Sequence, residues 1–489
     1  MNQEWIILWS IAWPLLGGVG IVAAGQRHAN VRESVTLITA IGLAALVWGL
    51  MPDVLAGARP SVVLFEFMPG LALEFRVEPL GMLFAGLASL LWVVNSVYSI
   101  GYMRGNREKH QTRFYVCFAI ALSAAIGVAF AANLVTLFLF YEILTISTYP
   151  LVVHKGDEKA VRSARVYLGV LLSTSIGLLL PAIIWTYGLS GTTEFAEGGI
   201  LAGHIEGPLA GVLLVLFVFG VGKAAVMPVH RWLPAAMVAP TPVSALLHAV
   251  AVVKAGVFTI TKIVVYIFGT DFLLHAVQSA WLPYVAAFTI ITASVVALRQ
   301  TNLKRLLAYS TVAQLSYVVL AAGLFQPLAT MGAAIHIVAH GFGKITLFFA
   351  AGAIYTATKK TEIPQLDGIG RRMPWTMAAF SIGALSMIGL PPTAGFVSKW
   401  YIVSGSLQAG SDIAVAAIVI STVLNAAYFL PILYRAWFLP YDPDDPVMRG
   451  EAPLPVVLAV TASAMLTLAF FFYHEPAVLL AENLVASGP

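Results

Sequence analysis

GVLLVLFVFGVGKAAVMPVHRWLPAAM, residues 211–237, is an over-long apolar stretch that Pro228 and Pro234 interrupt. A proline deletes a helical hydrogen bond, and the freed carbonyl groups are tolerated in lipid only where protein or water satisfies them. Lys223 lies close to the interruption, although a charge at the bilayer centre costs about 2.5–3.5 kcal/mol. The stretch therefore predicts a broken transmembrane helix, the seventh of the chain, with a functional lysine.

A second stretch has the same features. PWTMAAFSIGALSMIGLPPTAGFVSKWYIV, residues 374–403, contains Pro391 and Pro392, followed by Lys399. Two interrupted spans that lie five spans apart, each with a lysine near its break, indicate two inverted five-helix repeats with polar sites near the midplane. The expected units are repeat one, about 113–268, repeat two, about 275–437, and a single transmembrane domain, 1–489.

The composition is that of an integral membrane protein. Of 489 residues, 60% are hydrophobic and 10% are charged, whereas a soluble domain has about 25% charged residues. The net charge of +4 is too small and scattered to indicate nucleic-acid binding. The single cysteine, Cys117, excludes disulfides, iron–sulfur clusters and cysteine zinc sites. No dinucleotide, Walker or haem motif is present, so we expect no cofactor or catalytic site, and an ion gradient or partner chains must supply the energy.

The apolar stretches predict an all-α integral membrane fold with about fourteen transmembrane helices, of which helices 7 and 12 are broken. Each stretch has roughly the 20 apolar residues that a span needs. They lie near 4–24, 33–55, 79–103, 113–131, 133–153, 162–188, 208–237, 242–268, 275–298, 304–324, 328–356, 374–407, 413–437 and 453–473. An even number of spans places both termini on one side.

The basic residues indicate which side this is. Alternate connections are rich in lysine and arginine, as in residues 155–165, whereas the opposite ones contain acids such as Glu194 and Glu206. By the positive-inside rule the basic connections face the cytoplasm and both termini face outward. Lys304 and Arg305, at the inner start of the tenth span, are expected to be anchors of this kind. We expect the cytoplasmic membrane of a bacterium or archaeon.

Glu142 is the only acidic residue well inside a span, near the middle of the fifth. An unpaired carboxylate there would become protonated, because burial disfavours its charged form. Lys223 on the broken seventh helix is its natural partner. Such a pair either pins the two helices together or, if it opens and closes, acts as a proton switch.

Lys254 lies in the middle of the eighth span, six residues after His248. This spacing places the two side chains on different helix faces, so water or another helix must link them. His248 can pass protons near neutral pH, or it can be a hydrogen-bonded core residue. Lys262 lies nearer the outer end of the same helix and is expected to extend its ammonium to the membrane surface.

The eleventh span contains His336, His340 and Lys344 at steps of four residues. Side chains at i, i+4 and i+8 share one helix face, so these three predict a titratable stripe. We do not expect the two histidines to bind a metal, because a lysine follows and no carboxylate is near in sequence. Lys399 follows the second break, where admitted water suits a terminal proton donor.

Several long motifs occur in the order found in one family. GKAAVMPVHRWLPAAMVAPTPVSALLHAVAVVKAGVF, residues 222–258, resembles the signature of the antiporter-like subunits shared by respiratory complex I, membrane-bound hydrogenases and Mrp-type sodium/proton antiporters. LKRLLAYSTVAQLSY (303–317), HIVAHGFGKITLFF (336–349) and IGLPPTAGFVSKW (388–400) match the same family. The resemblance covers roughly spans three to thirteen.

The resemblance implies a fourteen-helix subunit with two inverted repeats and a central hydrophilic axis. In such a subunit Glu142 pairs with Lys223, and Lys254 is the central lysine with His248 beside it. The helix-eleven residues correspond to His340 and Lys344. Lys399 is similar to the lysine of the Mrp D subunit. The chain ends soon after the last span, which favours an Mrp D-like or hydrogenase-associated subunit, although PTPVSALLHA (240–249) is closer to distal and A-type chains.

These observations predict a proton-translocating subunit whose partners are other membrane subunits; whether it also carries sodium is left open. Protons would enter near Lys223 or Lys254, pass His248, waters, His340 and Lys344, and leave from Lys399. One alternative is a self-contained secondary transporter of a small solute, which would need a midplane pocket with substrate-specific groups. Another is a scaffold subunit without conduction, which should lack some of these residues.

Overall fold

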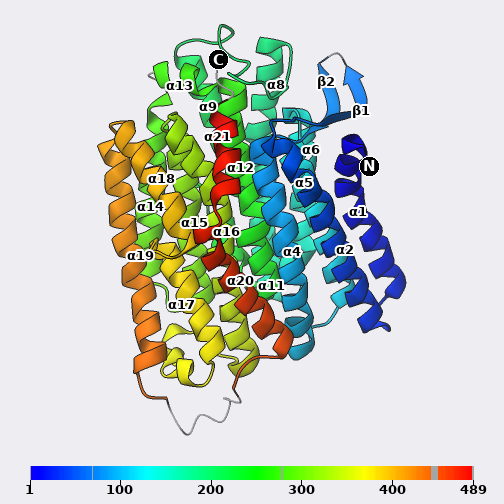
Figure 1. Cartoon of the computed structure of the whole chain (residues 1–489), viewed down its shortest axis with the longest axis vertical. Helices are drawn as coiled ribbons and strands as arrows, with labels where there is room; N and C mark the ends of the chain where they lie inside the picture. Colours follow the sequence, from blue (N-terminus) through cyan, green and yellow to red (C-terminus); the bar gives the residue numbers. More distant parts are fainter. Residues whose placement is uncertain (1, 69, 277–278, 442–449, 487–489) are drawn as a thin grey trace.

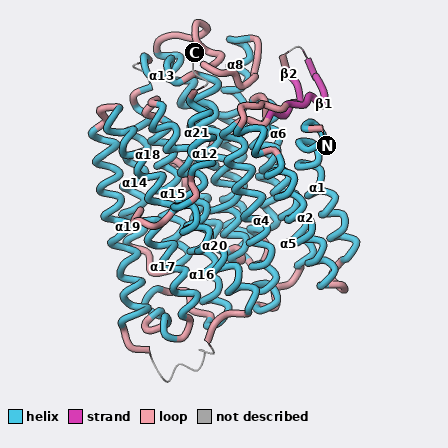
Figure 2. Tube along the Cα trace, in the orientation of Figure 1, coloured by secondary structure: helices cyan, strands magenta, loops and turns pink. Residues whose placement is uncertain are grey.

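The computed structural model describes residues 2–68, 70–276, 279–441 and 450–486. The long helices run side by side along the long axis of the molecule (Figure 1). Loops gather mainly at the two ends of the bundle (Figure 2). The predicted all-α membrane fold is confirmed.

The helices of the first part of the chain are α1 (Gln3–Ala24), α2 (Ala29–Gly49), α3 (Met51–Leu55), α4 (Pro79–Gly105), α5 (Gln111–Phe130), α6 (Leu134–Val152), α7 (Glu158–Thr174), α8 (Leu180–Ser190), α9 (Pro208–Gly220), α10 (Trp232–Ala235), α11 (Thr241–Ala245) and α12 (Val252–Ile263). Those of the second part are α13 (Thr270–His275), α14 (Trp281–Leu298), α15 (Leu303–Ala322), α16 (Pro327–Thr358), α17 (Pro374–Ile388), α18 (Ala394–Gln408), α19 (Asp412–Phe438), α20 (Leu454–Phe472) and α21 (Glu475–Val485). Three π-helical turns follow α7, α11 and α12, at Ser175–Leu179, Leu246–Val250 and Val264–Phe268.

Twelve helical segments of the described residues are long and apolar enough to cross a membrane. Two shorter apolar helices, α9 and α17, form the first halves of the two predicted broken spans. The number of fourteen spans and the inverted repeats stay predictions.

The sequence analysis missed an antiparallel hairpin between the second and third spans. Its strands are β1 (Ser61–Met68) and β2 (Leu71–Arg76), with Ser61 opposite Arg76. The hairpin projects from one end of the bundle. Helix α21 and the start of α1 lie toward the same end (Figure 1). A short hairpin in an apolar sequence gives a weaker signal than a helix of 20 apolar residues, because its strands are brief.

Helix α16 lies in the middle of the bundle (Figure 1). Its most apolar window is entirely buried, and it packs against α4, α12, α15, α17, α18 and α20. A helix that is mostly apolar is stable in such a central position, because its apolar faces contact other apolar helices. In contrast, α1, α2 and α19 lie at the edges, where about a third of their apolar windows is buried.

Both predicted helix breaks are confirmed. Helix α9 ends at Gly220, and a short 3-10 turn (Gly222–Ala224) carries Lys223. The indole of Trp232 donates a hydrogen bond to the Gly222 carbonyl at 2.9 Å and so satisfies one carbonyl at the break. Helix α17 ends at Gly389, whose φ of +91° suits glycine, and α18 continues after the two prolines.

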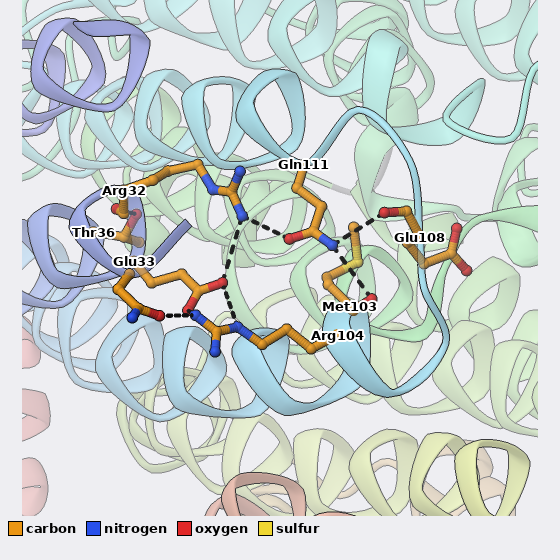
Figure 3. Close-up of polar contacts among 8 residues, drawn as sticks. Arg32, Glu33, Thr36, Met103, Arg104, Glu108 and Gln111 are labelled. Atoms are coloured by element: carbon orange, nitrogen blue, oxygen red, sulfur yellow. Dashed lines mark hydrogen bonds and ion pairs between the residues drawn. The ribbon is translucent and has the colours of Figure 1, made fainter. Parts of the chain in front are cut away.

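A buried charge network joins α2 to α4 and to the start of α5 (Figure 3). The Glu33 carboxylate accepts from Arg104 Nε at 3.0 Å and forms an ion pair with Arg32 at 3.4 Å. Arg32 also donates to Gln111 Oε1 at 2.7 Å. Since the side chains of Arg32 and Glu33 are 3% and 5% exposed, the Glu33 carboxylate supplies the counter-charge of a guanidinium group away from solvent, and it also binds Arg104, whose side chain is 46% exposed.

We expect Glu33→Ala to destabilise the fold by about 3 kcal/mol, because it leaves the Arg32 guanidinium buried without its counter-charge. The measurement is the thermal unfolding midpoint of the purified protein in detergent. Arg162→Ala is the matched control: it removes an ion pair to Glu158 whose side chains are 79% and 89% exposed, and it should change stability by less than about 0.5 kcal/mol. Equal effects of the two substitutions would contradict a structural role for the buried network.

Candidate functional site

Lys223 is fully buried and is held by α6. Its Nζ donates to the Tyr141 carbonyl at 2.8 Å and to Thr145 Oγ1 at 2.5 Å, and it lies 3.1 Å from the centre of the Tyr141 ring. The Tyr141 hydroxyl also accepts from the Lys223 main-chain N–H at 3.1 Å. A carbonyl, a hydroxyl and an aromatic face therefore contact this ammonium group directly, and the Glu142 carboxylate attracts it from a greater distance.

The predicted direct pair between Glu142 and Lys223 is absent from this structure. Glu142 follows Tyr141 on α6, so its side chain leaves the helix about 100° away from the Tyr141 side chain. It is half-buried, and its Oε1 atom has no hydrogen-bond partner among the described residues. Tyr141 and Thr145, spaced i and i+4, share the face of α6 that meets Lys223, and only the packing of α6 against the break shows this.

Lys254 on α12 contacts α16 directly. Its Nζ lies 2.6 Å from His340 Nδ1, so an amine and an imidazole are joined by a hydrogen bond. Lys254 and His248 make separate contacts with α16, in line with the prediction that their spacing places them apart, and the predicted link through water or another helix stays a prediction. The His248 ring packs at 4.8 Å from Phe348, and neither of its nitrogens has a partner among the described residues. Buried imidazole nitrogens normally make hydrogen bonds, so this is a position for water.

The three α16 residues of the predicted stripe are all buried, but they contact three different neighbours. His340 contacts α12, His336 Nδ1 lies 2.8 Å from Ser398 Oγ on α18, and Lys344 Nζ donates to Ser310 Oγ on α15 at 2.9 Å. Four residues turn a helix by about 400°, so each successive side chain is rotated by about 40°. The three side chains of the predicted stripe therefore diverge along the helix and point toward different neighbouring helices. The His336 and His340 rings stack at 5.8 Å.

Lys399 reaches back from α18 to the end of α17. Its Nζ donates to the carbonyls of Met387 and Ile388 at 3.0 and 2.8 Å and to Thr422 Oγ1 at 3.2 Å. These carbonyls belong to the last turn of α17, where the helix dipole favours a cation. The ring of Tyr317 stacks on His336 at 5.6 Å and lies 5.2 Å from Lys399 Nζ, so it stands between the two.

The expectation that Lys262 extends to the membrane surface is wrong. Lys262 is fully buried, forms an ion pair with Glu78 at 3.0 Å and donates to the Ala131 carbonyl at 2.6 Å. Glu78 precedes α4, just outside an apolar span, and so supplies a counter-charge at the depth of Lys262. The position of Glu78, an acidic residue directly before the third apolar stretch, was the sequence signal that could have identified it as the partner of Lys262. Lys304 also reaches inward, to the Ala239 carbonyl at 2.6 Å.

The break that carries Lys223 is docked on α12 near Lys254. A Cβ atom on Gly256 would lie 2.3 Å from the Ala224 main-chain nitrogen, so the two segments touch through their backbones. This contact connects the α6–Lys223 cluster with the Lys254–His340 pair. No group of three or more residues able to bind a metal occurs in the described part of the chain.

Comparisons with known proteins agree with this architecture. Residues 131–425 match the family described as NADH:quinone oxidoreductase/Mrp antiporter, TM. The chain is 34% identical to NADH-quinone oxidoreductase subunit N of Desulforudis audaxviator over 398 residues, which cover 79% of this chain and 77% of that protein. It is 28% identical to NAD(P)H-quinone oxidoreductase chain 5 of Synechocystis sp., over 82% of this chain but only 62% of that longer protein.

The fold is also found in a solved assembly. A chain of the Mrp complex from Dietzia sp. DQ12-45-1b superposes with a TM-score of 0.88 and 23% sequence identity. The superposition covers 99% of this chain and 97% of that chain. At this identity the likeness concerns the fold alone.

We expect Gly256→Ala to destabilise the protein by about 1–3 kcal/mol, because the new methyl group must push the Lys223 turn away from α12. The measurement is again the unfolding midpoint in detergent. The control is Gly169→Ala, at an exposed glycine within α7 that has no atom within 4 Å of its Cβ position, where alanine should be neutral or stabilising. A Gly256→Ala variant as stable as the wild type would show that the turn is not docked on α12.

Proposed function

The chain belongs to the NADH:quinone oxidoreductase/Mrp antiporter transmembrane family, and from this premise we propose that it is a proton-translocating subunit of a multi-subunit membrane complex of the Mrp or complex I type. The observation that carries the proposal is the 2.6 Å contact between Lys254 and His340 inside the bundle. Proton transfer between two hydrogen-bonded groups that both titrate is the elementary step of a relay.

The route begins at the basic end of the molecule. A cavity of about 410 Å³ there is lined by residues that include Tyr102, Lys155, Thr241 and Lys304. This cavity supports entry from the cytoplasmic face, in line with the positive-inside rule, with both termini outward and the protein in the cytoplasmic membrane of a bacterium or archaeon.

Lys254 passes its proton to His340 Nδ1, and the resulting imidazolium releases a proton from Nε2. His336 receives it through water, since the stacked rings place no nitrogen pair within hydrogen-bond distance. Ser398 and the Tyr317 ring lie beside His336 on the way to Lys399. Lys399 is the outlet in a pump and the inlet in a gradient-driven antiporter.

Lys223 is the gate of this route. In this structure its ammonium group is bound by Tyr141 and Thr145, and Glu142 lies on the next position of the same helix. Transfer of Lys223 from these neutral acceptors to the Glu142 carboxylate would change the field at Lys254. Moving one charge across 100 mV takes about 2.3 kcal/mol, comparable with one hydrogen bond to a charged group, about 1.5–3 kcal/mol.

A self-contained transporter of a small solute is the alternative class. It is disfavoured because the buried lysines that the structure describes at the two breaks and on α16 are held by carbonyls and hydroxyls of the protein itself. Purification separates the two: a subunit of a complex copurifies with other membrane proteins and has no activity without them, whereas a solo transporter is active alone.

We expect Lys254→Ala to lower proton transport at least tenfold, because it removes the donor to His340. The assay is dye-reported acidification of inverted membrane vesicles that contain the assembled complex, with assembly checked by native electrophoresis. Lys109→Ala, at an exposed lysine of an inner connection, is the control and should transport normally. Normal transport by an assembled Lys254→Ala complex would remove the proposed relay.

A further inference from the structure

Gln314 is a buried amide in the apolar helix α15, within the motif LKRLLAYSTVAQLSY (303–317). Such a group is costly unless its polar atoms make hydrogen bonds. Its Nε2 atom donates at 3.4 Å to the Met387 carbonyl, which also accepts from Lys399 Nζ at 3.0 Å. A carbonyl can only accept, so this contact fixes the orientation of the amide and turns Oε1, its acceptor, away from Met387. The Gln314 Oε1 atom has no hydrogen-bond partner among the described residues.

The neighbours of Gln314 on α15 show which part of α16 it faces. Ser310, Gln314 and Tyr317 are spaced i, i+4 and i+7, so they share one face of the helix. Ser310 Oγ accepts from Lys344 Nζ at 2.9 Å. The Tyr317 ring stacks on His336 at 5.6 Å. Helices α15 and α16 therefore run antiparallel here, and Gln314 faces the turn of α16 that lies midway between these two contacts.

That turn of α16 contains His340, which brings further unpartnered atoms to the same place. The Nε2 atoms of His336 and His340 are buried and have no hydrogen-bond partner among the described residues. Together with Gln314 Oε1, three such atoms lie along the contact of α15 with α16. Buried polar groups normally make hydrogen bonds, and a buried water typically makes about three of them. These atoms are therefore the partners that one water molecule requires.

The other contacts of the two imidazoles fix the role of each Nε2 atom. The Ser398 hydroxyl donates its one proton to the Gly395 carbonyl at 3.3 Å, so it accepts from His336 Nδ1, and Nε2 of neutral His336 is an acceptor. On His340 the arrangement is reversed. Its Nδ1 accepts from the Lys254 ammonium group, so neutral His340 has its proton on Nε2. A water between the rings can accept from His340, donate to His336 and give its second hydrogen to an amide oxygen.

We propose that Gln314 is a positioning residue that holds a water molecule between His340 and His336. The inference rests on the proton-transport function proposed above and adds the residue that orders its water-mediated step. In that step His340, protonated on both nitrogens after transfer from Lys254, gives the Nε2 proton to the water. The water gives one of its own protons to His336 Nε2. The Gln314 amide accepts a hydrogen bond throughout and does not change its protonation.

The test is the rate of proton transport by the assembled complex in inverted vesicles. Gln314→Met has nearly the same size but no acceptor, so it should lower the rate about tenfold, in line with the loss of one hydrogen bond. Gln314→Asn keeps the amide on a side chain one methylene shorter and should stay within about threefold of the wild type. Gln300→Met is the matched control: the Gln300 amide donates to the Val296 carbonyl at 3.1 Å, outside the relay, and its loss should not change the rate.

The order of the two variants separates the binding of water from simple packing. If Gln314 only filled space, methionine would be the better replacement, and asparagine, which leaves a void, would be the worse one. That order, or wild-type transport by Gln314→Met, would overturn the proposal. Should Gln314→Met fail to assemble, Gln314→Leu takes its place in the comparison. Failure of both variants to assemble would show that the amide is structural, and this result also overturns the proposal.

Lys254→Ala separates this inference from the function on which it rests. If Lys254→Ala abolishes transport but Gln314→Met transports at the wild-type rate, the water position is wrong and the relay stands. If an assembled Lys254→Ala complex transports normally, the relay itself is wrong, and the inference falls with it.

Discussion

The constraint on which the structure depends is that buried ammonium groups in an apolar bundle must find acceptors within the protein. Lipid offers none, and an unsatisfied polar group there costs several kcal/mol. The acceptors that this chain supplies are mostly neutral. Lys399 uses the carbonyls that end α17, Lys223 uses a carbonyl and a hydroxyl of α6, and Lys344 uses a serine. Among the buried lysines of the described residues, Lys262 is the one whose ammonium group contacts a carboxylate, that of Glu78.

Neutral acceptors suit groups that must change charge. A lysine locked to a carboxylate loses several kcal/mol when it gives up its proton, because the carboxylate is left buried and alone. When a lysine that is hydrogen-bonded to a carbonyl or hydroxyl gives up its proton, the acceptor left behind is neutral. Its burial without a partner costs much less free energy than that of a carboxylate. We therefore infer a structural role for the ion pair of Lys262. Lys254, Lys344 and Lys399 can lose a proton at a lower cost, which a proton relay requires.

The helix breaks and the glycines beside them position these lysines. Gly256 lets the Lys223 turn touch α12 through backbone atoms, and Gly389 ends α17 where the Lys399 side chain lies against it. Each break thus exposes carbonyls and brings a lysine to a neighbouring helix in one step. At another edge of the bundle, the Glu33 network keeps α2 attached to α4 and to the start of α5 (Figure 3).

The sequence by itself determined the membrane class, the two breaks at Pro228 and at Pro391–Pro392, and the identity of the lysines and histidines inside the bundle. Length, hydropathy and proline act locally along the chain, so a sequence contains this information. Only the tertiary structure decided which groups meet. Lys254 contacts His340 and not His248, Lys223 contacts Tyr141 and not Glu142, and Lys262 finds Glu78. Each of these contacts depends on the rotation and depth of one helix relative to another, where about 100° per residue changes the partner. Such rotations are set by packing among helices far apart in the chain, and spacing along one helix does not report them.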